Sequence, residues 1–220
     1  MNVKCCTLVF SIPRFISVTL IALALYPLSA FAEGIEQNGF SIPGYFFERS
    51  LDQWQPQKGD IFVADTAKNV GYLMHPNGEY VDITIGSGQR KTVYYLGRKY
   101  FAASPEGLFH VYKKERQYGD PVTFDKDGAF FRLITDAGER TSYGIHSTLY
   151  IDKILSRDRD GRYASMGCVL MNRDSLRAVE QTVAVTGDLP AFITEGLQKW
   201  DAAFAKYIQD KNAIVAVNGL

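Results

Sequence analysis

A cysteine and a histidine in the second half of the chain are the residues best suited to chemistry. Cys168 ends the run Ser-Met-Gly-Cys at residues 165–168, and His146 precedes it by 22 residues. The thiolate is the nucleophilic form of cysteine, and a nearby imidazole lowers the thiol pKa and shuttles its proton. This pair predicts acyl transfer, with Cys168 as the nucleophile and His146 as the base.

The residues around the cysteine fit the same chemistry. Gly167 allows a tight backbone turn in which consecutive N–H groups converge on one point. Such a pair of donors, from Gly167 and Cys168, is what a tetrahedral oxyanion needs during acyl transfer. Ser165 either braces this turn through its hydroxyl or orients the imidazole, and the sequence leaves both roles open.

A structural role for the cysteine is the alternative. Cysteine is commonly a small buried apolar residue, and residues 168–171 (Cys-Val-Leu-Met) fit an ordinary core strand. An unpaired thiol in an exported protein is, however, exposed to oxidation and mispairing. The Gly-Cys turn, the Tyr-Gly-Ile-His segment at 143–146 and the export signal described next together favour a nucleophile.

Residues 1–32 have the organisation of a cleaved secretory signal peptide. A cationic start without acids leads into an apolar stretch at residues 15–28, and Ala-Phe-Ala ends the segment as a small-x-small cleavage site. The stretch is short for a spanning helix, so a retained membrane anchor is the weaker hypothesis. We therefore expect an exported protein, periplasmic or associated with the cell envelope.

Cleavage after residue 32 changes the cysteine count and the charge. Cys5 and Cys6 leave, so Cys168 is the one remaining cysteine and no internal disulfide is possible. Two of the 24 cations and none of the 24 acids leave as well, so 22 basic residues face 24 acidic ones. This near-neutral balance gives no support for nucleic-acid binding. Residues 33–220 are about the size of one domain.

The pattern of the chain predicts a mainly β fold with late helices, a β-rich α+β domain at residues 60–220 that follows a lead-in at 33–59. The Asn77-Gly78 pair is a strong hairpin signal. Short strands at regular spacing indicate a barrel or a sandwich. The predicted strands are 60–65, 71–74, 80–85, 92–96, 108–112, 129–134 and 190–194.

Two helices are predicted near the C-terminus. Asn172 is placed to cap the first, which ends at Gly187. Leu197, Trp200 and Phe204 form an apolar stripe of helical period on a second, which we expect to pack on the sheet.

These features resemble the catalytic domain of the L,D-transpeptidases, the YkuD-type cell-wall enzymes. That family has a histidine followed by Ser/Thr-x-Gly-Cys, as at His146 and 165–168. Residues 104–111, Ser-Pro-Glu-Gly-Leu-Phe-His-Val, are similar to the family's Thr-Pro-x-Gly-x-Phe-x-Val segment. The segment 143–146 matches its Tyr-x-Ile-His. The resemblance covers residues 60–193.

The resemblance implies a YkuD-like β-sandwich or barrel with the cysteine in a groove and no cofactor. Cys168 would attack the diaminopimelate carbonyl of a peptidoglycan stem peptide, and D-alanine would leave. An amine from a second stem would resolve the thioester into a 3→3 cross-link. Tyr143, Ser147 and Arg162 are possible substrate contacts.

The chain departs from the family pattern in two places. Ser147 stands where many members have glycine, which puts a side chain near the site. Leu170 stands where the family has arginine, a residue suited to binding a substrate carboxylate. Arg162 or Arg173 would be candidate replacements, although each also fits a solvated surface charge.

Two other functions remain open. A hydrolase, an L,D-carboxypeptidase or endopeptidase, would use the same residues on the same stem peptides. A wall-binding module would retain the fold without catalysis. A sortase or a papain-like protease fits less well, because the residues beside the cysteine or the order of Cys and His differ. A zinc site is not expected, because one cysteine and three scattered histidines lack ligand-pair spacing.

Overall fold

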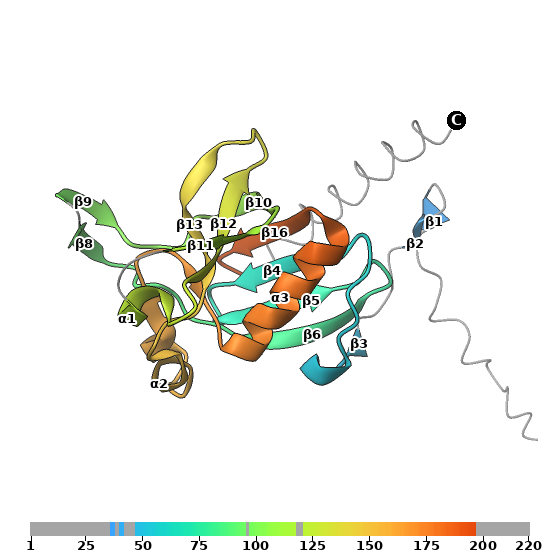
Figure 1. The fold of residues 1–220 in the computed structure, drawn as a ribbon, viewed down its shortest axis with the longest axis horizontal. Helices are drawn as coiled ribbons and strands as arrows, with labels where there is room; N and C mark the ends of the chain where they lie inside the picture. Colours follow the sequence, from blue (N-terminus) through green and yellow to red (C-terminus); the bar gives the residue numbers. More distant parts are fainter. Residues whose placement is uncertain (1–35, 38–39, 42–46, 96, 118–120, 197–220) are drawn as a thin grey trace, which may run out of the picture. The chain divides into compact units, whose positions relative to one another are not determined.

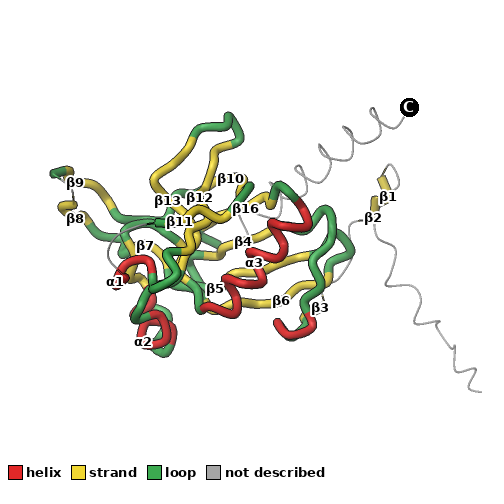
Figure 2. Tube along the Cα trace, in the orientation of Figure 1, coloured by secondary structure: helices red, strands yellow, loops and turns green. Residues whose placement is uncertain are grey.

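The computed structural model describes residues 36–37, 40–41, 47–95, 97–117 and 121–196 of the 220-residue chain. Strands dominate the described residues, and the only long helix among them is α3 (Arg173–Thr186), as Figures 1 and 2 show. The prediction of a mainly β fold with late helices is confirmed.

The regular elements follow in chain order. The strands are β1 (Glu36–Gln37), β2 (Phe40–Ser41), β3 (Phe47–Glu48), β4 (Ile61–Asp65), β5 (Val70–Met74), β6 (Glu79–Thr84), β7 (Ser87–Gly88), β8 (Thr92–Tyr95), β9 (Arg98–Phe101), β10 (Gly107–Val111), β11 (Lys114–Arg116), β12 (Ala129–Thr135), β13 (Arg140–His146), β14 (Tyr163–Ser165), β15 (Val169–Leu170) and β16 (Leu189–Thr194). The other helical segments are η2 (Leu51–Gln53), α1 (Pro121–Phe124), α2 (Ile151–Leu155) and η3 (Asp160–Arg162).

A ten-stranded mixed sheet forms the body of the fold. Its order is β15-β13-β12-β10-β16-β4-β5-β6-β3, with β11 added to β12. The central strands β16 and β4 are parallel, and every residue of both is buried. Continuous apolar runs of this kind are typical of strands covered on both faces. The pairing of β16 with β4 brings together two strands that are more than 120 residues apart in the sequence.

One core unites both halves of the sheet with α3. Side chains from β4–β6 and from β12, β13 and β15 belong to the same buried cluster as the apolar face of α3. The helix begins as predicted, because the Asn172 side chain accepts from the Ser175 amide at 2.8 Å. It ends at Gly187, whose φ of 72° lies in the left-handed region.

The predicted hairpin turn is also present. Asn77 and Gly78 connect β5 to β6, and Gly78 has a φ of 87°. The strand predicted at 92–96 does not belong to the ten-stranded sheet. It is β8, which pairs only with β9 among the described strands and leaves Tyr94 and Tyr95 exposed.

The folded part begins before residue 60, the boundary expected from the sequence. β3 pairs with β6, and Trp54 is buried, with its Nε1 donating to Thr182 Oγ1 at 2.9 Å. The signal peptide predicted at 1–32 and the helix predicted from Leu197 lie outside the described residues. Among the described helices, none combines the length and apolar character needed to cross a bilayer.

Candidate active site

The ends of two neighbouring strands bring the candidate nucleophile and base to one face of the sheet. β13 and β15 are parallel, with His146 opposite Leu170. Continuing this register back by two residues puts Gly144 beside Cys168. Because side chains two residues apart on a strand share a face, Cys168 and His146 lie on the same face, offset by two positions.

The turn before the cysteine requires a glycine. Gly167 has a φ of 122°, a conformation that residues with a side chain rarely adopt. A Cβ there would lie 2.4 Å from Cε1 of Tyr143 and 2.9 Å from the Ala103 carbonyl oxygen. The turn therefore packs against β13 without room for a side chain.

The Ser165 hydroxyl braces this turn. It accepts from the Gly167 amide at 3.0 Å and donates to the Cys168 carbonyl at 2.6 Å. The Gly167 amide is therefore directed to Ser165, whereas the Cys168 amide donates to no residue in the described ranges. Of the two backbone donors expected from the sequence, only that of Cys168 is open for an oxyanion in this conformation.

The thiol of Cys168 is partly exposed but closely packed. Burial raises its pKa to about 11, although a hydrogen bond with the Gly144 backbone and the charge of Arg132 both act to lower it. At pH 7 a group with this pKa is ionised in about one molecule in 10⁴. The resting cysteine is therefore a neutral thiol.

The His146 imidazole is buried and also neutral. It is 4% exposed and lies between the rings of Phe124 and Phe130, at centroid distances of 5.2 and 5.6 Å. Burial lowers its pKa, against the opposing effect of backbone hydrogen bonds with Ser147 and Thr123. Its Nδ1 lies 2.8 Å from the Ser147 carbonyl oxygen, to which it donates as the neutral Nδ1–H tautomer.

No hydrogen bond or ion pair joins the sulfur and the imidazole in the described part of the chain. Two backbone groups engage the ring instead, so it must turn away from one of them before it can take the Cys168 proton. The site is a neutral Cys–His pair on one face, with the base held in a position that does not yet reach the thiol.

An arginine–glutamate pair beside the cysteine was missed by the sequence analysis. Arg132 lies opposite Gly144 in the β12–β13 pairing, and Cys168 lies beside Gly144 on its other side. Arg132 and Cys168 therefore stand in the same row across the three strands, on the same face of the sheet. Two of the Arg132 nitrogens lie 2.9 and 3.0 Å from Glu115 Oε2, and a third donates to the Thr141 carbonyl at 2.7 Å. Strand periodicity puts Phe130 and Arg132 on one face, but the pairing that brings this face to Cys168 is tertiary.

The three predicted substrate contacts have different surroundings. Tyr143 packs against Gly167 and the core. Ser147 is buried, and its hydroxyl lines a pocket on the α3 side of the sheet. Arg162 donates through Nε to the carbonyls of Leu155 and Arg157.

The two arginines considered as replacements at Leu170 are both engaged with other groups of the chain, Arg162 as described above and Arg173 with a carboxylate. Leu170 is buried on the same face as His146, opposite it in the pairing. Arg173 forms a two-point ion pair with Asp125, at 2.6 and 2.8 Å. The cation whose charge acts on the thiol is Arg132.

The other two histidines pair with carboxylates. His75 Nδ1 lies 2.6 Å from Asp60 Oδ1, and its ring stacks on Trp54 at 4.0 Å. His110 lies between Asp188 and Asp136, at 2.8 and 3.2 Å. Both arrangements are structural contacts of the sheet.

Comparison with known proteins finds similarity only at the level of structure. No family model matches the chain, and no curated protein sequence matches it. The solved structures that it resembles include several L,D-transpeptidases.

The enzyme from Xylanimonas cellulosilytica is 18% identical, with 64% of this chain and 63% of that chain covered and a TM-score of 0.45. The enzyme from Mycobacterium tuberculosis is 18% identical, with 62% and 57% covered and a TM-score of 0.40. The catalytic domain from Enterococcus faecium is 16% identical, with 63% and 98% covered and a TM-score of 0.40. The chain thus spans about three fifths of the first two structures. At these identities and TM-scores no activity transfers to it, and its chemistry has to be inferred from its own residues.

Proposed function

We propose that this protein is a cysteine acyltransferase that acts on peptidoglycan stem peptides and forms 3→3 cross-links through a Cys168 thioester. The observation that carries the proposal is the shared face of Cys168 and His146, with the cysteine on a glycine turn braced by Ser165. The sequence resemblance at 104–111, 143–146 and 165–168 supplies the substrate class.

The first half-reaction forms the thioester. His146 takes the proton from the Cys168 thiol while the sulfur attacks the carbonyl carbon of diaminopimelate. The Cys168 amide is positioned to stabilise the resulting oxyanion. The carbon–nitrogen bond to D-alanine then breaks, and His146 returns the proton to the leaving amine.

The second half-reaction transfers the acyl group. An amine of a neighbouring stem attacks the thioester carbon, His146 accepts its proton, and the sulfur leaves as the new amide forms. The thiol is then regenerated by that proton. Water in place of the amine would give a carboxypeptidase.

The neutral resting pair restricts when the first step can occur. Because the pKa of Cys168 is about 11, the free thiol is a poor nucleophile at neutral pH. Binding of a stem has to release the imidazole from the Ser147 or Thr123 backbone and bring it to the sulfur. Arg132 is already paired with Glu115, so it is proposed to favour the thiolate of Cys168 rather than to bind a substrate carboxylate.

The substrate class also agrees with the proposed cellular location. Peptidoglycan lies outside the cytoplasmic membrane, and the signal peptide inferred at 1–32 would deliver the protein there. Residue 33 would then be the N-terminus of the active form, periplasmic or associated with the cell envelope.

Mass spectrometry of digested sacculi tests the proposal. Wild-type protein is expected to produce 3→3 dimers, and Cys168→Ala to produce none while keeping its circular dichroism spectrum, since one small side chain replaces another. His146→Ala is expected to lower turnover about 100-fold or more, because it removes the general base. The matched control is His110→Ala, which removes a histidine distant from the site and should leave turnover within about twofold. Wild-type turnover in Cys168→Ala would disprove the mechanism.

A catalytically silent wall-binding module is the second candidate. The raised thiol pKa and the absence of a described Cys168–His146 contact favour it. Sacculus binding without any change in muropeptides would support that function. Accumulating tripeptides without dimers would indicate the hydrolase instead.

A further inference from the structure

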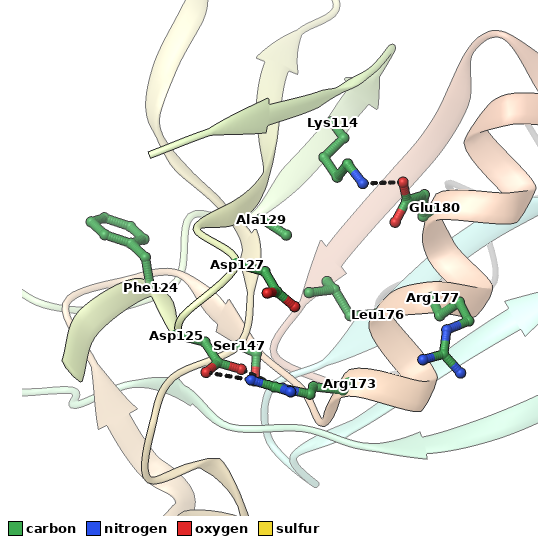
Figure 3. A pocket seen from close by; sticks show the side chains of 10 residues that line it. All are labelled: Lys114, Phe124, Asp125, Asp127, Ala129, Ser147, Arg173, Leu176, Arg177 and Glu180. Carbon is green, nitrogen blue, oxygen red and sulfur yellow. Dashed lines mark hydrogen bonds and ion pairs between the residues drawn. The ribbon is translucent and has the colours of Figure 1, made fainter. Parts of the chain in front are cut away.

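A pocket lies on the other side of the strand that carries His146. Its volume is about 220 Å³, and it is lined by the first turns of α3, by β11 and β12, and by the segment after α1, with one side open to solvent (Figure 3). Sites for drug-sized ligands are usually larger, about 300–1,000 Å³. The pocket is therefore suited to a ligand the size of an amino acid.

The Ser147 hydroxyl lines this pocket and has no partner. Ser147 is 2% exposed, and its Oγ forms no hydrogen bond with any described residue. Leaving a buried hydroxyl unpaired costs about 1–3 kcal/mol. The carbonyl of the same residue accepts from His146 Nδ1. A group bound in the pocket would therefore satisfy the hydroxyl one residue from the candidate base.

The charges around the pocket are mixed in sign, and two of them, the exposed Asp127 carboxylate and Arg173, act on each other electrostatically. Arg173 and Asp125 form one ion pair on one side of it, and Lys114 and Glu180 form another on the opposite side (Figure 3). The Asp127 carboxylate makes no hydrogen bond or ion pair with a described residue. Arg173 uses Nε and Nη2 for Asp125, which leaves Nη1 without a partner in the described ranges.

We propose that this pocket binds a small α-amino acid as its zwitterion. The ligand ammonium pairs with Asp127, and its carboxylate accepts from Arg173 Nη1 and the Ser147 hydroxyl. A ligand with only one charge would pair with only one of these two groups. The proposal does not depend on the proposed function, because the binding groups lie on the opposite face from Cys168.

Calorimetric titration of the full-length Cys168→Ala variant tests the site without turnover. D-alanine is the probe, since it is a small α-amino acid of the size of the pocket, and we expect saturable binding. N-acetyl-D-alanine lacks the ammonium, and D-alaninamide lacks the carboxylate, so each should bind about tenfold more weakly or worse. Inorganic phosphate tests whether the pocket takes any anion.

Substitutions locate the binding groups. In the same background, Asp127→Asn should weaken D-alanine binding about tenfold or more but leave N-acetyl-D-alanine unchanged, and Ser147→Ala should weaken both. Asp82→Asn is the matched control, because it removes the same charge from an exposed position on β6 and should change nothing.

Several results would overturn the proposal. They are an absence of saturable D-alanine binding, phosphate binding as tight as that of D-alanine, or equal affinities in Asp127→Asn and the control. None of them would bear on the acyl transfer proposed for Cys168, which is measured separately on sacculi.

Discussion

The ionisation of Cys168 is a balance between packing and two local charges. Burial raises its pKa, and the Gly144 backbone and the Arg132 guanidinium oppose the rise without cancelling it. A thiol held neutral in this way reacts slowly with oxidants, which would be an advantage for an unpaired cysteine if the protein is exported as proposed. Because the resting thiol is neutral, the proposed attack requires His146 to remove its proton.

The first prediction concerns the alkylation of this thiol. In a Cys5→Ser, Cys6→Ser background, the rate of iodoacetamide reaction should rise about tenfold per pH unit up to about pH 11, because only the thiolate reacts. Arg132→Gln should move the midpoint to higher pH, since it removes a charge that favours the thiolate.

Arg140→Gln is the control for that shift. Arg140 also pairs with Glu115, at 2.8 Å, but is mostly exposed and has no effect on the Cys168 pKa. A midpoint near pH 8.5 or below in the wild-type chain would contradict the neutral resting thiol.

At the scale of elements, the site depends on one turn and one strand pairing. The Gly167 turn directs β15 into parallel pairing with β13, and this pairing alone sets the offset between Cys168 and His146. The neighbouring β12 adds Phe130 and Arg132 to the same face. The positions of the reacting groups are therefore set by backbone hydrogen bonds more than by contacts between their side chains.

The second prediction tests that turn. Gly167→Ala should destabilise the protein by more than about 3 kcal/mol, because it adds a clash with Tyr143 and the Ala103 carbonyl to the backbone strain. Gly138→Ala is the matched control: Gly138 has a φ of 82° but open space around it, so only the strain of about 1 kcal/mol applies. Urea unfolding measures both, and equal losses would show that the turn is not close-packed.

Across the whole molecule, the ion pairs of one buried histidine connect segments that are distant in the chain. His110 on β10 contacts Asp188 just before β16 and Asp136 after β12. These contacts, first that with Asp188, raise the His110 pKa against the effect of burial. The protonated imidazole is thus favoured by folding.

The third prediction follows from the sign of that shift. Because the folded pKa of His110 is raised, its contribution to stability is fully present below the unfolded pKa of about 6.5 and is lost as pH rises through the folded pKa. The difference in unfolding free energy between wild type and His110→Gln should therefore shrink between pH 5.5 and 9 in urea titrations.

The contribution of His146 to stability depends on pH in the opposite direction from that of His110. It cancels when the unfolding free energies of wild type and His110→Gln are subtracted. The folded pKa of His146 is lowered, so its contribution is present above the unfolded pKa and is lost as pH falls. This contribution is common to both proteins and cancels in the difference. A difference that stayed constant or grew with pH would contradict the ion pairs of His110.

Much of the local structure was predictable because its causes are local. The Asn77-Gly78 hairpin, the cap at Asn172 and the end of α3 at Gly187 depend on a few consecutive residues. The strand carrying His146 was not predicted, because β13 alternates exposed and half-buried residues at its start and becomes buried only at its end. Its apolar pattern is too short to indicate a strand.

The sequence by itself determined the chemical identities: one cysteine after a glycine, a histidine before it, and a chain of short strands. Only the tertiary structure decided that Arg132 stands beside the thiol, that His146 is held by backbone carbonyls, and that Ser147 faces a pocket behind it. These positions depend on pairings such as β16 with β4 and on the bulge between Arg132 and Ile134. Such registers are set by how buried side chains pack across the whole sheet, which no local pattern contains.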